Sequence, residues 1–415
     1  MIRNSHSYNA QKIRIPHLKP GPVLTILLVI MSSYPPLSTD MYLPALPSIA
    51  TQFHTSMATM NLTLVLFFFF FAFSTLFWGP VSDRFGRKPS LLTGIILFTL
   101  ASAGCALANN AYQLIAFRVL QAMGAGAPVT ISIAIVQDLY RDDEKKKVLA
   151  LLSALFMVAP VVAPVLGSLI LSLLEWRVIF MLLVVLGLVS LSGGIFLPET
   201  NRHRIDRPLL KSFSGIFIVM KEPIFRGAVF VFSLPALVIL GFVGGSASIF
   251  MAGFGVSPSL FSLYFAVNAL FAIAGALIYV PLSKRISDLH TVWISLFITL
   301  GSGLLVLILG HRGPMLFMFC VVPATLFLAV LRPLGMDLMM SRSGHNAGAA
   351  SAVINFFFII IGSAGMVVVS LDWVSRTRVY ALLMIITGVV CLIAWGLLNQ
   401  SLSNEAPLVE QEAEV

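Results

Sequence analysis

The stretch GPVSDRFGRKP, residues 79–89, is a short basic turn between two long apolar segments, 59–80 and 90–109. Each segment has the roughly 20 mostly apolar residues that a helix needs to cross a bilayer. Positive charge in short loops marks the cytoplasmic side of membrane proteins, and glycine permits the backbone of a tight turn. The stretch therefore predicts two antiparallel membrane-spanning helices joined on the cytoplasmic side. The residues that carry this prediction are Gly79, Asp83, Arg84, Gly86, Arg87 and Lys88.

The composition of the whole chain agrees with a membrane protein. Of its 415 residues, 58% are hydrophobic and 10% are charged, whereas a soluble domain has about 25% charged residues. This excludes a soluble protein. The three cysteines show no metal-ligand or redox spacing, and no glycine-rich phosphate loop follows a predicted strand. We therefore expect no metal, no cofactor, no nucleic-acid partner and no enzymatic activity.

Twelve segments are long and apolar enough to span a bilayer, which predicts an all-α membrane protein. Most loops between them are short, but the basic segment 198–226 separates six segments from the following six. We expect an N-terminal half with a cytoplasmic arm at 1–197, a cytoplasmic linker at 198–226, a C-terminal half at 227–399 and an acidic tail without regular structure at 400–415. The predicted spans are 22–44, 59–80, 90–109, 113–136, 148–173, 178–197, 227–250, 258–281, 291–310, 314–335, 347–369 and 378–399.

The distribution of Lys and Arg fixes the expected orientation. If the N-terminus is cytoplasmic, 21 of the 26 basic residues lie on the cytoplasmic side, four lie outside and Arg118 lies within a span. We therefore expect both termini inside, in a monomeric multi-pass protein of the bacterial inner membrane. The segment VPLSKRISDLH, residues 280–290, follows the eighth span as 79–89 follows the second, and its basic composition supports a duplicated half.

The turn at 79–89 resembles a signature of the major facilitator superfamily, in which Gly, Asp-Arg and Gly-Arg-Lys lie between two spans. The resemblance implies two six-helix halves and a conformational gate on the cytoplasmic side. An alternative role for the three basic residues is topological, because they hold the turn inside. The two roles are compatible.

Two further spans resemble signatures of the same superfamily. FRVLQAMGAGAPV resembles its proton-coupling signature: Arg118 and Gln121 share a helix face, and Gly124 permits close helix packing. APVVAPVLGS resembles the exporter signature of drug:proton antiporters, although Ala163 and Ser168 replace the usual glycines. An ordinary small-residue helix contact is the alternative here. The residues of the second signature are Ala159, Ala163, Pro164 and Gly167.

The N-terminal half narrows the resemblance to the Bcr/CflA-type drug:proton antiporters, which include the MdtL-like multidrug exporters. The resemblance is dense over 22–200 and diffuse over 227–399. Some relatives carry a second acid about two turns before Asp40, where this chain has Ser32, so a mechanism with two carboxylates does not carry over. The stretches that match are LSTDMYLPALP at 37–47, Trp176–Arg177 with Phe180, and Pro198–Thr200.

Asp40 and Arg118 are ionisable residues at membrane depth, where charge is costly and a functional site is the default interpretation. At 1.5 Å per residue, Asp40 lies about 27 Å along its outward-running helix and Arg118 about 8 Å below the outer surface, so their depths are similar. A carboxylate removed from water gains a proton more readily, and a nearby cation opposes this. We expect Asp40 to be the proton- and cation-sensing site, with Arg118 controlling its protonation. The alternatives are a solvated structural residue for Asp40 and a cation bonded to helix carbonyls for Arg118.

Polar side chains within other spans are candidates for the substrate cavity, although each is more often a hydrogen-bond partner between helices. Near the cytoplasmic ends of their spans, we expect Asp138 to lie in a solvated, headgroup-facing loop and Arg332 to pair with Asp337. The cavity candidates are Tyr42, Asn61, Tyr264, Asn268 and Asn355.

These observations favour proton-coupled efflux of amphipathic small molecules such as antibiotics and dyes, by alternating access between the two halves. The expected partners are a drug-like substrate, protons and the lipid bilayer. Within transporters, the alternative is a proton-driven exporter of one endogenous metabolite, such as a siderophore, sugar or amino-acid derivative. A more remote alternative is a membrane protein that does not transport.

Overall fold

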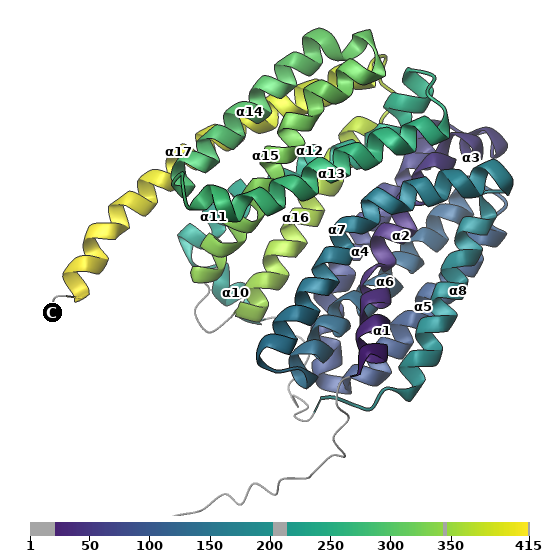
Figure 1. Cartoon of the computed structure of the whole chain (residues 1–415), viewed down its shortest axis with the longest axis horizontal. Helices are drawn as coiled ribbons and strands as arrows, with labels where there is room; N and C mark the ends of the chain where they lie inside the picture. Colours follow the sequence, from purple (N-terminus) through teal and green to yellow (C-terminus); the bar gives the residue numbers. More distant parts are fainter. Residues whose placement is uncertain (1–20, 202–213, 343–346, 414–415) are drawn as a thin grey trace, which may run out of the picture.

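The computed structural model describes residues 21–201, 214–342 and 347–413, and all regular structure in these ranges is helical. The helices form two groups that lie side by side in Figure 1, α1 to α8 and α10 to α17. The first group comprises α1 (Pro22–Ser32), α2 (Tyr34–Asp40), η1 (Leu43–Ala45), α3 (Leu46–Gln52), α4 (Met57–Phe85), α5 (Arg87–Leu107), α6 (Ala111–Leu139), α7 (Asp142–Leu173) and α8 (Arg177–Phe196). The second comprises α10 (Ser214–Val219), α11 (Pro223–Ser233), α12 (Ala236–Ala247), η2 (Ser248–Gly253), α13 (Pro258–Ser283), α14 (Asp288–Leu309), η3 (Gly310–Arg312), α15 (Pro314–Ser341), α16 (Ala347–Ser370) and α17 (Arg376–Ala413).

The predicted all-α architecture with twelve spans is confirmed. Eleven helical stretches in the described ranges are long and apolar enough to cross a bilayer, and one bent pair of helices supplies a twelfth. The span expected at 227–250 consists of α11, α12 and η2, which together run from Pro223 to Gly253. Much of the 198–226 segment, residues 202–213, lies outside the described residues.

The first span is broken rather than continuous, which the single predicted segment 22–44 did not anticipate. It comprises Pro22–Ser32 and Tyr34–Gln52, bent by 42° where they meet. The cause is the pair Pro35–Pro36, because proline has no N–H to donate and its ring clashes with the preceding turn. The regular helix α2 then ends at Asp40, and the chain continues through the short 3-10 turn η1.

Small residues allow the helices of the first group to pack closely. A Cβ atom added at Gly124 of α6 would lie 2.4 Å from the backbone nitrogen of Phe98 in α5. A Cβ added at Gly94 of α5 would lie 2.1 Å from Cβ of Ala127. The two helices therefore meet backbone against backbone, as small residues permit in membrane helix pairs.

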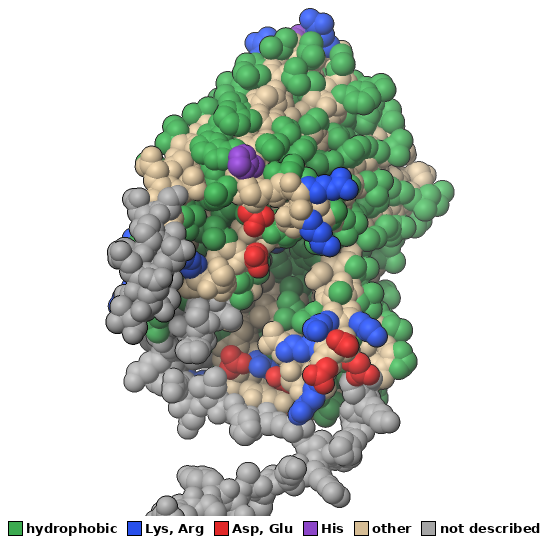
Figure 2. Space-filling view, turned by 60° about the vertical axis from the view of Figure 1, so that its left-hand side comes forward, with side chains coloured by type: hydrophobic (Ala, Val, Ile, Leu, Met, Phe, Trp, Pro, Cys, Tyr) green, Lys and Arg blue, Asp and Glu red, His purple; other side chains and the backbone are tan. Residues whose placement is uncertain are grey.

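The two groups contact each other along two helix pairs, α4 with α16 and α7 with α13. Ser262 of α13 donates a hydrogen bond of 2.8 Å to the carbonyl oxygen of Pro164 in α7. Asn61 of α4 donates one of 3.2 Å to the hydroxyl of Ser248 in η2. Away from these contacts, Figure 2 shows a deep hollow with acidic and basic side chains around its mouth.

The last helix departs from the expectation of a tail without regular structure at 400–415. Helix α17 continues from Arg376 to Ala413, beyond the predicted end of the span at residue 399. The segment is rich in Leu, Glu, Gln and Ala, which are good helix formers. Because it follows a helix that already exists, it needs no new nucleus.

Candidate functional site

Arg118 lies two turns after the start of α6 and is fully buried, with 0% of its side chain exposed. Its Nη1 donates to the backbone oxygen of Ser38 at 3.0 Å and to Oε1 of Gln121 at 2.6 Å. The hydrogen bond to Ser38 joins α6 to the broken first span. Arg118 is therefore held between two helices that are 80 residues apart in the sequence.

The Ser38 carbonyl is available because α2 ends two residues later, at Asp40. The last four carbonyls of a helix have no partner within it, and a buried carbonyl without a partner costs free energy. The break in the first span thus creates an acceptor inside the protein, and the Arg118 guanidinium occupies it. A continuous helix at this position would keep its carbonyls for its own backbone.

Asp40 lies beside this cluster and is 5% exposed. Its carboxylate accepts a hydrogen bond of 2.9 Å from the hydroxyl of Thr39. Asp40 and Arg118 are close enough to interact electrostatically, but among the described residues they form no ion pair. The alternative for Asp40, a solvated residue at the membrane interface, predicted an exposed side chain, whereas the side chain is buried.

Aromatic rings cover the Arg118 guanidinium. Its Cζ lies 4.2 Å from the ring centre of Phe67 and 5.3 Å from that of Tyr42. The Nε and Nη2 atoms have no hydrogen-bond partner among the residues that the structure describes. Cation–π contacts compensate only part of the free-energy cost of burying a charge, so the buried Arg118 side chain destabilises the folded protein. A costly buried charge of this kind is typical of a functional site in a membrane protein.

Gln121 and Gly124 extend the cluster toward α5. The Gln121 side chain donates to the Ser102 hydroxyl at 2.7 Å while it accepts from Arg118. Ser102 donates in turn to the backbone oxygen of Phe98. The close approach at Gly124 places α5 within reach of this chain. The coupling-helix residues predicted from the sequence therefore form one connected set.

The small-residue stripe of α7 packs against the first span and the second group of helices. Ala159, Ala163 and Gly167 are buried. A Cβ added at Gly167 would lie 2.1 Å from the backbone oxygen of Met41, next to Asp40. Pro164 offers its carbonyl to Ser262. The stripe is thus a close helix contact, and it borders the Asp40 segment.

The basic turn at 79–89 is shorter than its sequence suggests. Helix α4 runs to Phe85 and α5 begins at Arg87, so Gly86 alone separates them. Its φ of 109° is one that residues with a Cβ rarely adopt. Gly79 lies inside α4 rather than in a turn, Arg84 contacts the Phe85 ring, and Lys88 donates to the Ile195 carbonyl at 2.6 Å.

Arg87 is the centre of a polar network at this end of the protein, which we call the Gly86 end. Its guanidinium lies 2.5 Å from Oδ1 of Asp83, 3.1 Å from Oδ2 of Asp138 and 2.7 Å from the Ser82 hydroxyl. Asp138 also accepts from the Thr200 hydroxyl at 3.0 Å. Asp138 is exposed, as expected, but it lies in α6 rather than in a loop, and its carboxylate pairs with Arg87.

Glu199 completes the Gly86 end and was not identified as a site residue from the sequence. Its carboxylate accepts from the backbone N–H of Arg87 at 2.9 Å and of Lys88 at 3.3 Å. It thereby caps the N-terminus of α5, where N–H groups lack helical partners. Asn201 donates to the Asp83 carbonyl at 2.8 Å. The only sequence signal was the Pro198–Thr200 stretch that matched the resemblance.

The cavity candidates are dispersed rather than clustered. Tyr42 packs on Arg118, with its hydroxyl 3.2 Å from that of Thr63, and the Asn61 amide bridges α4 and η2. Tyr264 stacks on Phe250 with ring centres 5.1 Å apart. Two amides have helical partners: Asn268 accepts from Thr325 at 2.8 Å, and Asn355 donates to the Ser351 carbonyl at 3.0 Å.

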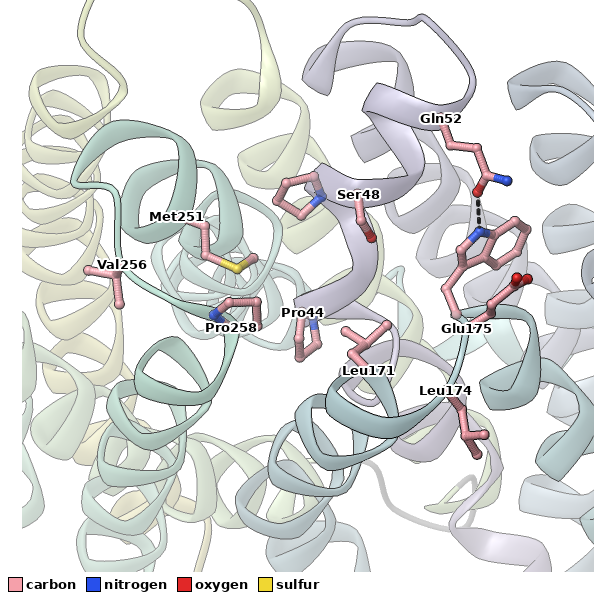
Figure 3. Close-up of a pocket in the computed structure, with 11 residues that line it drawn as sticks. Pro44, Ser48, Gln52, Leu171, Leu174, Glu175, Met251, Val256 and Pro258 are labelled. Atoms are coloured by element: carbon pink, nitrogen blue, oxygen red, sulfur yellow. Dashed lines mark hydrogen bonds between the residues drawn. The ribbon is translucent and has the colours of Figure 1, made fainter.

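A separate cavity of about 610 Å³ lies at the opposite end, where α7 and α8 meet at Trp176. Figure 3 shows that α3, α7 and the η2–α13 connection surround it. The Trp176 indole donates to Oε1 of Gln52 at 2.6 Å across its edge. Prolines and aliphatic side chains from both groups line most of it, including Pro44, Leu171, Met251 and Pro258.

Comparison with known proteins agrees with this geometry. The family model of the Major Facilitator Superfamily matches residues 28–366. The uncharacterized MFS-type transporter YdgK of Bacillus subtilis is 29% identical over 398 residues, which cover 92% of this chain and 97% of that protein.

Two relatives have names that refer to drug resistance. A bicyclomycin resistance protein homolog of Haemophilus influenzae is 32% identical over 249 residues, 59% of this chain and 63% of its own. The multidrug resistance protein MdtL of Escherichia coli K12 is 33% identical over 238 residues, 56% of this chain and 60% of its own. The match therefore spans less than two thirds of these two proteins.

Two solved structures share the fold. A bacterial homolog of the human lysosomal transporter Spinster, inward-facing and unoccupied, has a TM-score of 0.68 at 16% identity, covering 91% of this chain and 95% of that chain. A D-xylose–proton symporter has a TM-score of 0.67 at 13% identity, and the match covers 89% of this chain and 97% of that chain.

The fold and the buried charged cluster define a multi-pass membrane transporter of two helical groups rather than an enzyme. The chain belongs to the Major Facilitator Superfamily.

Proposed function

We propose that the protein exports amphipathic small molecules, such as antibiotics and dyes, in exchange for protons. In this proposal Asp40 binds the proton and Arg118 controls access to it. The names of the two resistance relatives support export of drugs, although their matches are partial. The proposal further places the protein in the bacterial inner membrane with both termini in the cytoplasm, because the basic residues concentrate on that side.

The observation that carries the proposal is the arrangement of Arg118 between Ser38 and Gln121, next to a buried Asp40. In this arrangement the guanidinium is bonded to neutral oxygens, and within the described part of the chain the hydrogen-bond donor to the Asp40 carboxylate is the Thr39 hydroxyl. That environment suits a protonated Asp40, since a buried carboxylate without a paired cation is costly. A shift of the first span relative to α6 that paired the two charges would favour release of the proton.

The break in the first span supplies a means for such a shift. Because α2 ends at Asp40, the Ser38 and Asp40 acceptors sit at the end of a helix rather than within it. A small rotation of this end exchanges one acceptor for the other at Arg118. The tight contact between Gly167 and Met41 connects the same segment to α7, which also contacts the second group. Proton binding and movement of the two halves would thereby be linked.

The experiment is uptake of a panel of dyes and antibiotics into inverted membrane vesicles, with and without a protonophore. We expect wild-type uptake to require the proton gradient. The Asp40→Asn variant removes the titratable group at nearly constant volume, and we expect it to lose gradient-driven uptake while remaining folded in the membrane. Asp372→Asn is the matched control: Asp372 is an exposed acid paired with Arg376 at 2.7 Å, and its loss should leave uptake unchanged.

Three outcomes would contradict the proposal in different ways. Uptake that persists in Asp40→Asn removes this residue from the mechanism. Wild-type uptake that ignores the protonophore rejects proton coupling. A panel with no transported compound at all rejects multidrug export and favours an exporter of one endogenous metabolite.

A further inference from the structure

A second arginine, Arg332 of α15, lies within a span and has no part in the cluster around Arg118. Its side chain is exposed, and its guanidinium lies over the ring of Phe358 in α16, a helix that contacts α4 of the first group. This position is expected for a residue on the side of α15 that faces the first group and the hollow rather than the outer surface. The sequence had suggested an ion pair with Asp337 at the end of the span, and in the described part of the chain that pair is absent.

The helical positions explain why the two do not pair. Asp337 is five residues after Arg332, which places it about 140° around the helix. Asp337 shares its direction with Phe319, eighteen residues or about five turns earlier, and Phe319 is 64% exposed on an apolar, lipid-facing side. Arg332 therefore points away from that side. Asp337 instead interacts electrostatically with Tyr279 of α13.

The inward face of α15 is polar at two levels. Thr325 is seven residues before Arg332, so the two lie on the same face about 10 Å apart. Thr325 is hydrogen-bonded to Asn268 of α13. The Arg332 guanidinium lies over the ring of Phe358 in α16, with Cζ 4.1 Å from the ring centre. Such stacking fixes the orientation of a guanidinium without neutralising its charge or occupying its N–H groups.

We propose that Arg332 binds an acidic group of the transported molecule, so that the hollow prefers amphipathic organic anions and zwitterions over their uncharged or purely cationic analogues. The proposal rests on the proposed export function and specifies its substrate class. A guanidinium matches the planar, two-oxygen geometry of a carboxylate. By contrast, the acid in the first span, Asp40, is buried and does not offer its charge to a ligand in the same way.

The test measures binding of two dyes that differ by one charge, rhodamine B and its ethyl ester, to the purified full-length protein in phosphatidylcholine nanodiscs. Rhodamine B carries a free carboxylate beside its cationic chromophore, and the ester has only the chromophore. From fluorescence anisotropy we expect wild type to bind rhodamine B about tenfold more tightly than the ester, as for one hydrogen-bonded charge. In Arg332→Gln we expect this preference to vanish while ester binding is retained.

Two further variants separate a specific contact from a general effect of charge. Arg332→Lys keeps the charge and should keep part of the preference. Lys284→Gln removes one exposed positive charge from the turn after α13 and should keep all of it. Equal affinity of wild type for the two dyes, absence of binding of either dye, or an unchanged preference in Arg332→Gln would each overturn the proposal.

A lipid headgroup offers the same anionic chemistry, so the measurement is repeated in nanodiscs that contain phosphatidylglycerol. Unchanged rhodamine B affinity supports a soluble ligand at Arg332. A loss of rhodamine B binding in wild type but not in Arg332→Gln would assign the site to lipid and overturn the proposal. Because binding is measured without a proton gradient, its result is independent of whether the export experiment succeeds.

Discussion

The turn between α4 and α5 and the turn between α13 and α14 occupy corresponding places in the two halves but are built differently. At the first, Gly86 alone separates the helices, and Arg87 collects acceptors from three other parts of the chain. At the second, residues 284–287 form an exposed turn, and Ser287 caps α14 through the nearby His290 N–H. Among the described residues, Lys284 and Arg285 form no ion pair.

The two arginines within spans, Arg118 and Arg332, also differ between the halves. Arg118 of the first half is sealed from solvent and bonded to two helices. Arg332 of the second half is exposed, and its guanidinium stacks on the ring of Phe358. This difference matches the division of roles that we propose for the two halves. In the two proposals, the connected charges of the first half serve coupling and the exposed charge of the second half binds a ligand.

The largest effect that tests this division is expected at Arg118. Arg118→Met keeps an apolar side chain of useful length but removes the charge, and we expect gradient-driven transport to fall about 100-fold, the upper range of typical coupling between sites. The thermal midpoint in detergent should be unchanged or higher, because replacing a poorly paired buried charge is often stabilising. Transport that stays near the wild-type rate would make Arg118 a structural cation bonded to carbonyls, as the alternative interpretation holds.

A smaller effect, on stability, is expected where the first half packs most closely. Gly124→Ala places a Cβ 2.4 Å from the Phe98 backbone, so α5 and α6 must separate. Overpacking of this kind costs about 1–3 kcal/mol. Gly301→Ala in α14 is the control, since no atom of the described residues lies within 4 Å of its added Cβ. Equal thermal midpoints for the two variants would contradict the close contact.

The smallest effect is expected at the two turns themselves. Glu199→Ala leaves the Arg87 and Lys88 N–H groups without their carboxylate acceptor and should lower stability by about 1 kcal/mol. Ser287→Ala removes the local cap in the second half. Its hydrogen bond to the His290 N–H is long at 3.5 Å, and its 2.6 Å contact with the His290 ring is exposed, so we expect less than half that loss. Thermal midpoints of both variants, measured against wild type in the same detergent, decide the comparison. A greater loss in Ser287→Ala would reverse it.

Much of the architecture was predictable because bilayer thickness imposes a length on each span. Apolar segment length predicted twelve helices, and small residues at Gly124 and Gly167 predicted close contacts that the structure contains. The proximity of Asp40 and Arg118 was expected from their depth alone. The prediction of a continuous first span was wrong, although Pro35 and Pro36 in the sequence indicated a break.

Only part of the polar network at the Gly86 end could be predicted from the sequence. The basic turn identified Arg87, but Asp138 and Glu199 lie about 50 and 110 residues further along the chain. From its neighbours in the sequence, each of these two acids is simply a carboxylate at the end of a span. Nothing in a single sequence says that α6 and the segment after α8 bring them to the same guanidinium. The exposure of Arg332 was equally hidden, because it depends on how α15 is rotated relative to α13 and α16.

The sequence by itself determined that this chain crosses a membrane repeatedly as helices, because an unpaired backbone in hydrocarbon is too costly for any other arrangement of such apolar segments. It also determined which few charges lie at membrane depth. Only the tertiary structure decided their partners: Ser38 and Gln121 for Arg118, Asp138 for Arg87, and Phe358 for Arg332. The reason is physical. Hydrophobic length is a local property of the chain, whereas a hydrogen bond between helices depends on the rotation and depth of both.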